Sequence, residues 1–250
     1  MAKLMSTAAA TGSNRSPTST SLRAKLVNIL VCPGDVFDDV IASPHSAAHW
    51  RLPVLLNCLA GIVLFLVVTN QAPPLGTIGG ELQSQPAATA MANPPTNTLA
   101  FGGAKDVPAG VEFVGMVAII LVAFAGTFWS ALVLWLIGRL FLRARFSWLK
   151  AVEIAGLTTV ILALESVVTT LLIIVTGNVF ARPALSLMVG EFDPADKAHQ
   201  VLAALNFFHF WMASVLAVGL AKLAEVSAGE GAVWVFGLWV ALRIALVVLS

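Results

Sequence analysis

The stretch LPVLLNCLAGIVLFLVVT, residues 52–69, contains 18 residues and no charged side chain. An α-helix needs about 20 mostly apolar residues to cross the hydrocarbon core of a bilayer. Four further apolar runs follow, and the longest is a charge-free stretch of 26 residues at 113–138. Together these runs predict an all-α integral membrane protein with a bundle of five transmembrane helices.

The spans are separated by charged or proline-rich segments. Residues 71–110 contain six prolines and six glycines, which predict a linker without regular structure. We predict a transmembrane domain over residues 51–250. Its five spans are expected at about 52–70, 113–138, 151–176, 200–221 and 232–249.

The composition agrees with a membrane protein and argues against several soluble classes. Hydrophobic residues make up 58% of the 250-residue chain and charged residues only 11%, whereas a soluble domain has about 25% charged residues. The formal net charge is +1, so no basic face is expected and nucleic acid is not a predicted partner. Cys32 and Cys58 are expected to be free, reduced thiols.

The first 50 residues divide into two parts. Residues 1–21 are rich in Ser, Thr and Ala and have no apolar segment of a signal peptide, so they predict a disordered cytoplasmic tail. Residues 22–50 predict an interfacial amphipathic segment of short helices on the membrane surface. Its apolar side chains recur with helical spacing at Leu22, Leu26, Ile29 and Leu30, and then at Val36, Phe37, Val40 and Ile41.

The distribution of Lys and Arg predicts the orientation of the chain. Loops on the cytoplasmic side of a membrane carry an excess of these residues. With a cytoplasmic N-terminus, that side has ten Lys and Arg residues, and the opposite side has only Lys105, Arg182 and Lys197. We therefore predict a cytoplasmic N-terminus and an outside C-terminus.

Four polar side chains lie inside the last three predicted spans. A helical rise of about 1.5 Å per residue places Glu165, Arg243, His209 and Asn206 in one layer of the outer half of the bilayer. An isolated charge there is costly, so partners are expected. The hypothesis is a Glu165–Arg243 pair with His209 and Asn206 nearby.

Three interpretations of this polar layer remain open. The layer is a clasp that fixes helix register, or a site for a proton, an ion or a lipid headgroup. In the third interpretation the side chains act independently, with Arg243 reaching the outer surface and Glu165 protonated.

The third span is expected to lie centrally in the bundle. One of its faces carries small residues at four-residue spacing, namely Ala151, Ala155, Thr159 and Ala163. Small residues let transmembrane helices approach closely. Another face carries Thr158, Glu165 and Thr169, so the helix is expected to touch neighbours on both sides. Contacts within the monomer and contacts in a homo-oligomer are both compatible with this pattern.

The sequence shows no set of residues typical of a catalytic centre. His45 and His49 are four residues apart in HSAAH, but the glutamate that follows the first histidine in zinc hydrolases is missing. A structural metal and pH-titrating histidines at the membrane surface are the alternatives for this pair. His209 and Ser214 lie on different faces of one helix. We predict no enzyme, no catalytic residues, no cofactor and no metal site.

The segment NILVCPGDVFDDVIASPHSAAHWRLPVLL, residues 28–56, together with the layout of the spans, resembles the Yip family of multi-pass membrane proteins. The resemblance is greatest to bacterial members, in which a proline, an aromatic residue and an apolar pair precede the first helix. Here these residues are Pro33, Phe37, Val40 and Ile41. The resemblance extends over roughly residues 27–249 and implies a five-helix bundle with a cytoplasmic N-terminus. Its similarity to bacterial members implies a location in the inner membrane of a bacterial-type cell.

The eukaryotic branch of this family implies vesicle traffic and binding of small GTPases. Its signatures contain tyrosine, and this chain has none, which puts small-GTPase binding in doubt. The expected function is a non-enzymatic membrane scaffold or adaptor that organises partner proteins or lipids. The expected partners are membrane lipids and a protein partner or a second copy of the chain. The alternative is a small transporter or channel component that uses the Glu165 layer.

Overall fold

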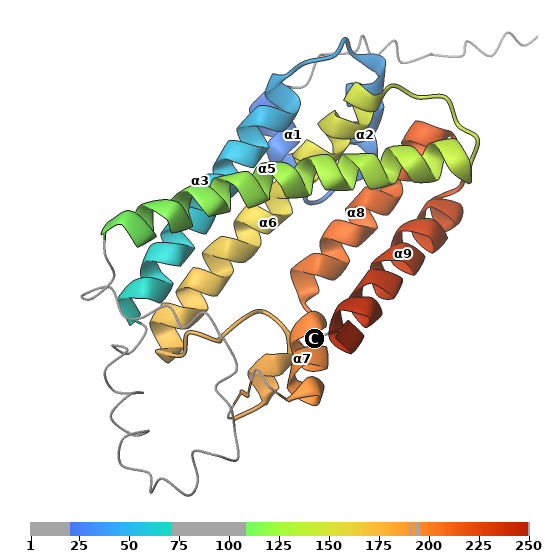
Figure 1. Ribbon diagram of the computed structural model, residues 1–250. Coiled ribbons are helices and arrows are strands. Elements are labelled where there is room, and N and C mark those ends of the chain that lie inside the picture. Colours follow the sequence, from blue (N-terminus) through green and yellow to red (C-terminus); the bar gives the residue numbers. More distant parts are fainter. Residues whose placement is uncertain (1–20, 72–108, 191, 194–195, 250) are drawn as a thin grey trace, which may run out of the picture.

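The computed structural model describes residues 21–71, 109–190, 192–193 and 196–249 (Figure 1). Apart from their boundary residues, the tail expected at 1–21 and the linker expected at 71–110 lie outside this part of the chain. The described residues form eight α-helices and one short 3₁₀ helix. These are α1 (Leu22–Asn28), α2 (Pro33–Ala42), α3 (Ala48–Gln71), α5 (Ala109–Leu140), α6 (Trp148–Thr176), η1 (Leu185–Met188), α7 (Lys197–Ala204), α8 (Phe207–Ala224) and α9 (Ala228–Leu249).

Five of these helices, α3, α5, α6, α8 and α9, are long and apolar enough to cross a membrane. Within the described residues no strand occurs. The prediction of an all-α bundle with five membrane spans is therefore confirmed, and the chain is a multi-pass membrane protein.

Helices α6, α8 and α9 run in alternating directions and α3 runs in the same direction as α6, so the bundle has two ends (Figure 1). The α2 end holds α1 and α2, the starts of α3, α6 and α9, and the last turns of α5 and α8. The α7 end holds η1, α7 and the opposite ends of α3, α6, α8 and α9. In Figure 1 α5 lies steeply across the direction of the other spans, and it packs against α3, α6 and α8.

Helix α6 lies centrally, as its two specialised faces predicted. It packs against α2, α3, α5 and α8. The close approach of α3 requires Gly156, because a Cβ atom there would lie 2.3 Å from the Cβ of Trp50 and 2.6 Å from its Cα. Ala151, Ala155 and Thr159 of the small-residue face are buried. This face therefore makes contacts within the monomer.

The fourth span begins later than predicted. Residues Lys197–Ala204 form the separate helix α7, and α8 begins at Phe207 rather than at about residue 200. Asn206 caps α8, since its side-chain oxygen accepts a hydrogen bond from the N–H of Phe208 at 2.8 Å. Asparagine is among the strongest N-cap residues, so the chain starts a new helix here.

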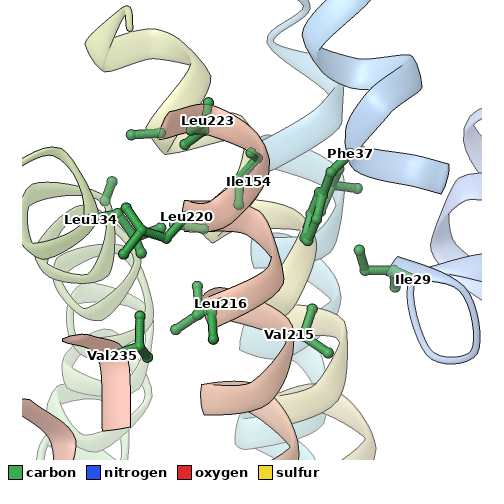
Figure 2. Close-up of a cluster of buried hydrophobic side chains, with 14 of the residues drawn as sticks. Ile29, Phe37, Leu134, Ile154, Val215, Leu216, Leu220, Leu223 and Val235 are labelled. Atoms are coloured by element: carbon green, nitrogen blue, oxygen red, sulfur yellow. The ribbon is translucent and has the colours of Figure 1, made fainter. Parts of the chain in front are cut away.

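The apolar side of α1 and α2 packs against the bundle, where lipid contact was expected. Ile29 and Phe37 are completely buried, and Figure 2 shows both in one cluster with Ile154 of α6 and Val215 of α8. The physical reason is that α2 lies against both α6 and α8. Contact with α6 and α8 therefore shields these apolar side chains from both lipid and water.

Candidate functional site

Near the α7 end, the structure brings together the four polar residues that the sequence singled out. The Nδ2 group of Asn206 donates to Oε1 of Glu165 at 2.6 Å. The Nε2 atom of His209 lies 3.5 Å from the other Glu165 oxygen, Oε2. Nη2 of Arg243 lies 2.7 Å from Nδ1 of His209. We call these four residues the outer polar cluster.

The structure does not show the direct Glu165–Arg243 pair that the hypothesis proposed. Among the described residues no ion pair joins these two side chains, and His209 links them. The reason is the helix order, because α8 packs against both α6 and α9. A guanidinium only donates hydrogen bonds, so Nδ1 of His209 must accept from Arg243 and the ring proton is on Nε2, facing Glu165.

Local structure on α8 and the preceding loop positions this cluster. The backbone of Asn206 forms an antiparallel bridge with Ala184, and the N–H of Phe207 donates to the carbonyl of Pro183 at 3.2 Å. Asn206 is therefore held at the helix start, with its amide facing α6. His209 follows in the first turn of α8, closer to the helix end than the sequence suggested.

A second polar cluster, at the α2 end, was not predicted from the sequence. Glu153 of α6 is completely buried. Its Oε1 accepts from the backbone N–H of Ser46 at 2.6 Å and lies 3.2 Å from Nδ1 of His45 and 3.3 Å from Nδ1 of His49. Its Oε2 lies 2.8 Å from Nζ of Lys150. We call these residues the Glu153 cluster.

Lysines extend the Glu153 cluster into α1 and α2. Lys150 also donates to the backbone carbonyls of Val40 and Ser43, at 2.6 and 2.8 Å. Lys25 of α1 is buried, and its Nζ lies 3.0 Å from Oδ2 of Asp39 and 3.5 Å from Nε2 of His49. These contacts attach α1, α2 and the start of α3 to the membrane bundle.

The sequence contained a partial signal for the Glu153 cluster. The histidines of HSAAH and the glutamate of the third span are both near the same end of the predicted spans. Pairing them requires knowing that α3 and α6 are neighbours, although His49 and Glu153 are 104 residues apart. Glu153 therefore appeared only as an interruption of an apolar run.

The comparison with known families agrees with this architecture. The Yip1 domain family model matches residues 27–250, a region that includes both polar clusters. The chain belongs to the Yip1 domain family. Yip1 family proteins are generally non-enzymatic proteins of membrane traffic. No curated protein and no solved structure matches the chain.

Proposed function

We propose that the chain is a non-enzymatic membrane scaffold that presents α1 and α2 as a fixed docking surface for a partner protein. The observation that supports this proposal is the complete burial of Glu153 beneath that surface. A buried carboxylate bound to a backbone N–H, two histidines and a lysine holds the segment in one position. A partner then binds without first ordering this segment, which reduces the entropic cost of association.

The exposed side of this surface carries apolar side chains that are not buried in the core of the bundle. Val27 and Val31 are 64% and 77% exposed, and Cys32 beside them is an exposed free cysteine. Grouped apolar residues on a protein surface often mark an interaction site. We call the exposed residues of this segment, Val27, Asn28, Val31 and Cys32, the exposed tip and place the partner contact there.

The exposed tip faces the cytoplasm in this proposal, in the inner membrane of a bacterial-type cell. The excess of Lys and Arg at the α2 end supports this orientation. Cys32 is exposed and Cys58 is buried, so a membrane-impermeant maleimide is expected to label Cys32 and not Cys58. We expect labelling of Cys32 only after the cells are permeabilised; labelling in intact cells would reverse the orientation.

Photo-crosslinking in native membranes tests the scaffold proposal. A photoreactive residue at position 31 is compared with one at position 175, because Val175 is similarly exposed at 82% but lies near the α7 end. We expect a discrete adduct with another protein from position 31 alone. The same adducts from both positions, or none from position 31, would contradict the proposal. An adduct between two copies of the chain would instead indicate a homo-oligomer.

The alternative function is a small transporter or channel component that uses the outer polar cluster. Its support is that ionisable Glu165 and Arg243 lie inside spans, where such residues often serve ions or protons. Reconstitution into liposomes distinguishes the two functions. Proton or ion flux that is abolished by Glu165→Gln would favour the transporter, whereas equal leakage with wild type, variant and empty liposomes would favour the scaffold.

A further inference from the structure

A cleft of about 430 Å³ lies between α5, α6, α8 and α9. This volume is within the range of roughly 300–1,000 Å³ that is typical of small-molecule sites. Its walls are mainly apolar and include Val122, Leu162 and Leu238, while His209 and Arg243 of the outer polar cluster lie against it. The cleft thus combines an apolar wall with the positively charged side chain of Arg243.

Small side chains on the crossing helix α5 keep part of this space open. Ala123, Gly126 and Ser130 recur at three- and four-residue spacing and line the cleft. A Cβ atom on Gly126 would meet no other atom within 4 Å. Neighbouring side chains therefore leave this position unfilled, and the space beside it is available to a ligand.

The charges around the outer polar cluster favour an anion. Within the described residues Arg243 forms no ion pair; it contacts the neutral ring of His209 and lies 5.5 Å from the ring centre of Trp239. Arg182 lines the same small pocket as Glu165. Among the described residues of this region, two guanidiniums thus accompany one carboxylate, so positive charge is in excess in these apolar surroundings.

We propose that this cleft binds one anionic phospholipid, with an acyl chain along the apolar wall and the phosphate at Arg243. Arginine binds phosphate through charge-assisted hydrogen bonds, and basic pockets between transmembrane helices bind anionic headgroups. A partner helix fits the space less well. A helix about 10 Å across occupies roughly 850 Å³ over two turns, which is about twice the volume of the cleft.

This inference goes beyond the scaffold proposal, which concerns the opposite end of the bundle. The lipid site is tested by lipid binding and the scaffold by cross-linking at residue 31. Failure of one therefore leaves the other unaffected.

Native mass spectrometry of the full-length protein in a mild detergent tests the lipid site. Phosphatidylglycerol and phosphatidylcholine with identical palmitoyl and oleoyl chains are titrated separately. We expect one high-affinity phosphatidylglycerol per chain and weaker binding of phosphatidylcholine. Arg243→Gln should weaken phosphatidylglycerol binding about tenfold, because a charge-assisted hydrogen bond is lost. Arg243→Lys should restore most of the preference for phosphatidylglycerol.

A pair of glycine variants tests the position of the acyl chain. Gly126→Leu fills the cleft and should reduce the binding of both lipids. Gly237→Leu is the matched control, since a Cβ atom there also meets nothing within 4 Å and Gly237 does not line the cleft. Equal affinity of the wild type for the two lipids, or unchanged binding by Gly126→Leu, would overturn the proposal.

Discussion

The carboxylate of Glu153 accepts a hydrogen bond from the backbone N–H of Ser46 at 2.6 Å, although 107 residues separate the two in sequence. This contact joins α6 to the turn between α2 and α3. The carboxylate is completely buried, and a buried charge is stable only when it is paired and hydrogen-bonded. Glu153 and the segment above it therefore stabilise each other.

Replacing Glu153 should destabilise the whole fold. Glu153→Gln removes the negative charge opposite Lys150 and should lower the free energy of unfolding by about 3 kcal/mol, since loss of one partner from a buried pair is strongly destabilising. An unfolding titration with denaturing detergent measures this change.

The control for this measurement is Glu225→Gln. Glu225 is exposed, and its replacement should cost less than about 0.5 kcal/mol. Equal stability of the Glu153→Gln variant and the control would show that the Glu153 cluster does not hold the segment.

Gly156 sets the distance between α3 and α6. Gly156→Ala should destabilise the bundle by roughly 1–3 kcal/mol, the usual cost of overpacking, because its Cβ would overlap the backbone of Trp50. Gly126→Ala should cause no loss, since its Cβ meets open space. The same unfolding titration compares the two variants, and similar losses would argue against a close α3–α6 contact.

The division between what the sequence predicted and what it did not has a physical basis. Spans such as residues 113–138 were predictable because each must be apolar along its own length to cross lipid. The start of the fourth span was missed because the apolar pattern continues through Leu205, while the break depends on the capping side chain of Asn206. That capping residue, followed directly by FFHF, was the available signal.

The outer polar cluster gives a pairwise prediction. Double-mutant cycles should show a coupling energy of about 1 kcal/mol between His209 and Arg243, which lie in direct contact. The coupling between Glu165 and Arg243 should be below about 0.5 kcal/mol, because His209 lies between them. Unfolding titrations of the single and double glutamine variants supply these energies. A coupling energy for Glu165 and Arg243 larger than that for His209 and Arg243 would instead support the direct pair that the sequence suggested.

The sequence predicted which four residues form this cluster, but it did not predict which of them are in contact. Helical rise placed the four side chains at similar depth without knowledge of the fold. Which of them touch depends on the order of the helices around the bundle, and the apolar runs carry no information about that order. For the same reason the partners of Glu153, which come from a segment before the first span, were not assigned.

Cross-linking of α2 to α8 tests most directly that the α1–α2 segment is fixed to the bundle. Asp38 and Lys222 form an ion pair with side chains that are 57% and 39% exposed, so reagents reach both positions. In a chain with Cys32→Ser and Cys58→Ala, the cysteines of Asp38→Cys and Lys222→Cys should be joined in most molecules by a short thiol cross-linker in native membranes. The matched pair Asp38→Cys with Val175→Cys, at opposite ends of the bundle, should remain separate. If the first pair cross-links no better than the second, α2 is not fixed to the bundle and the proposed docking surface does not exist.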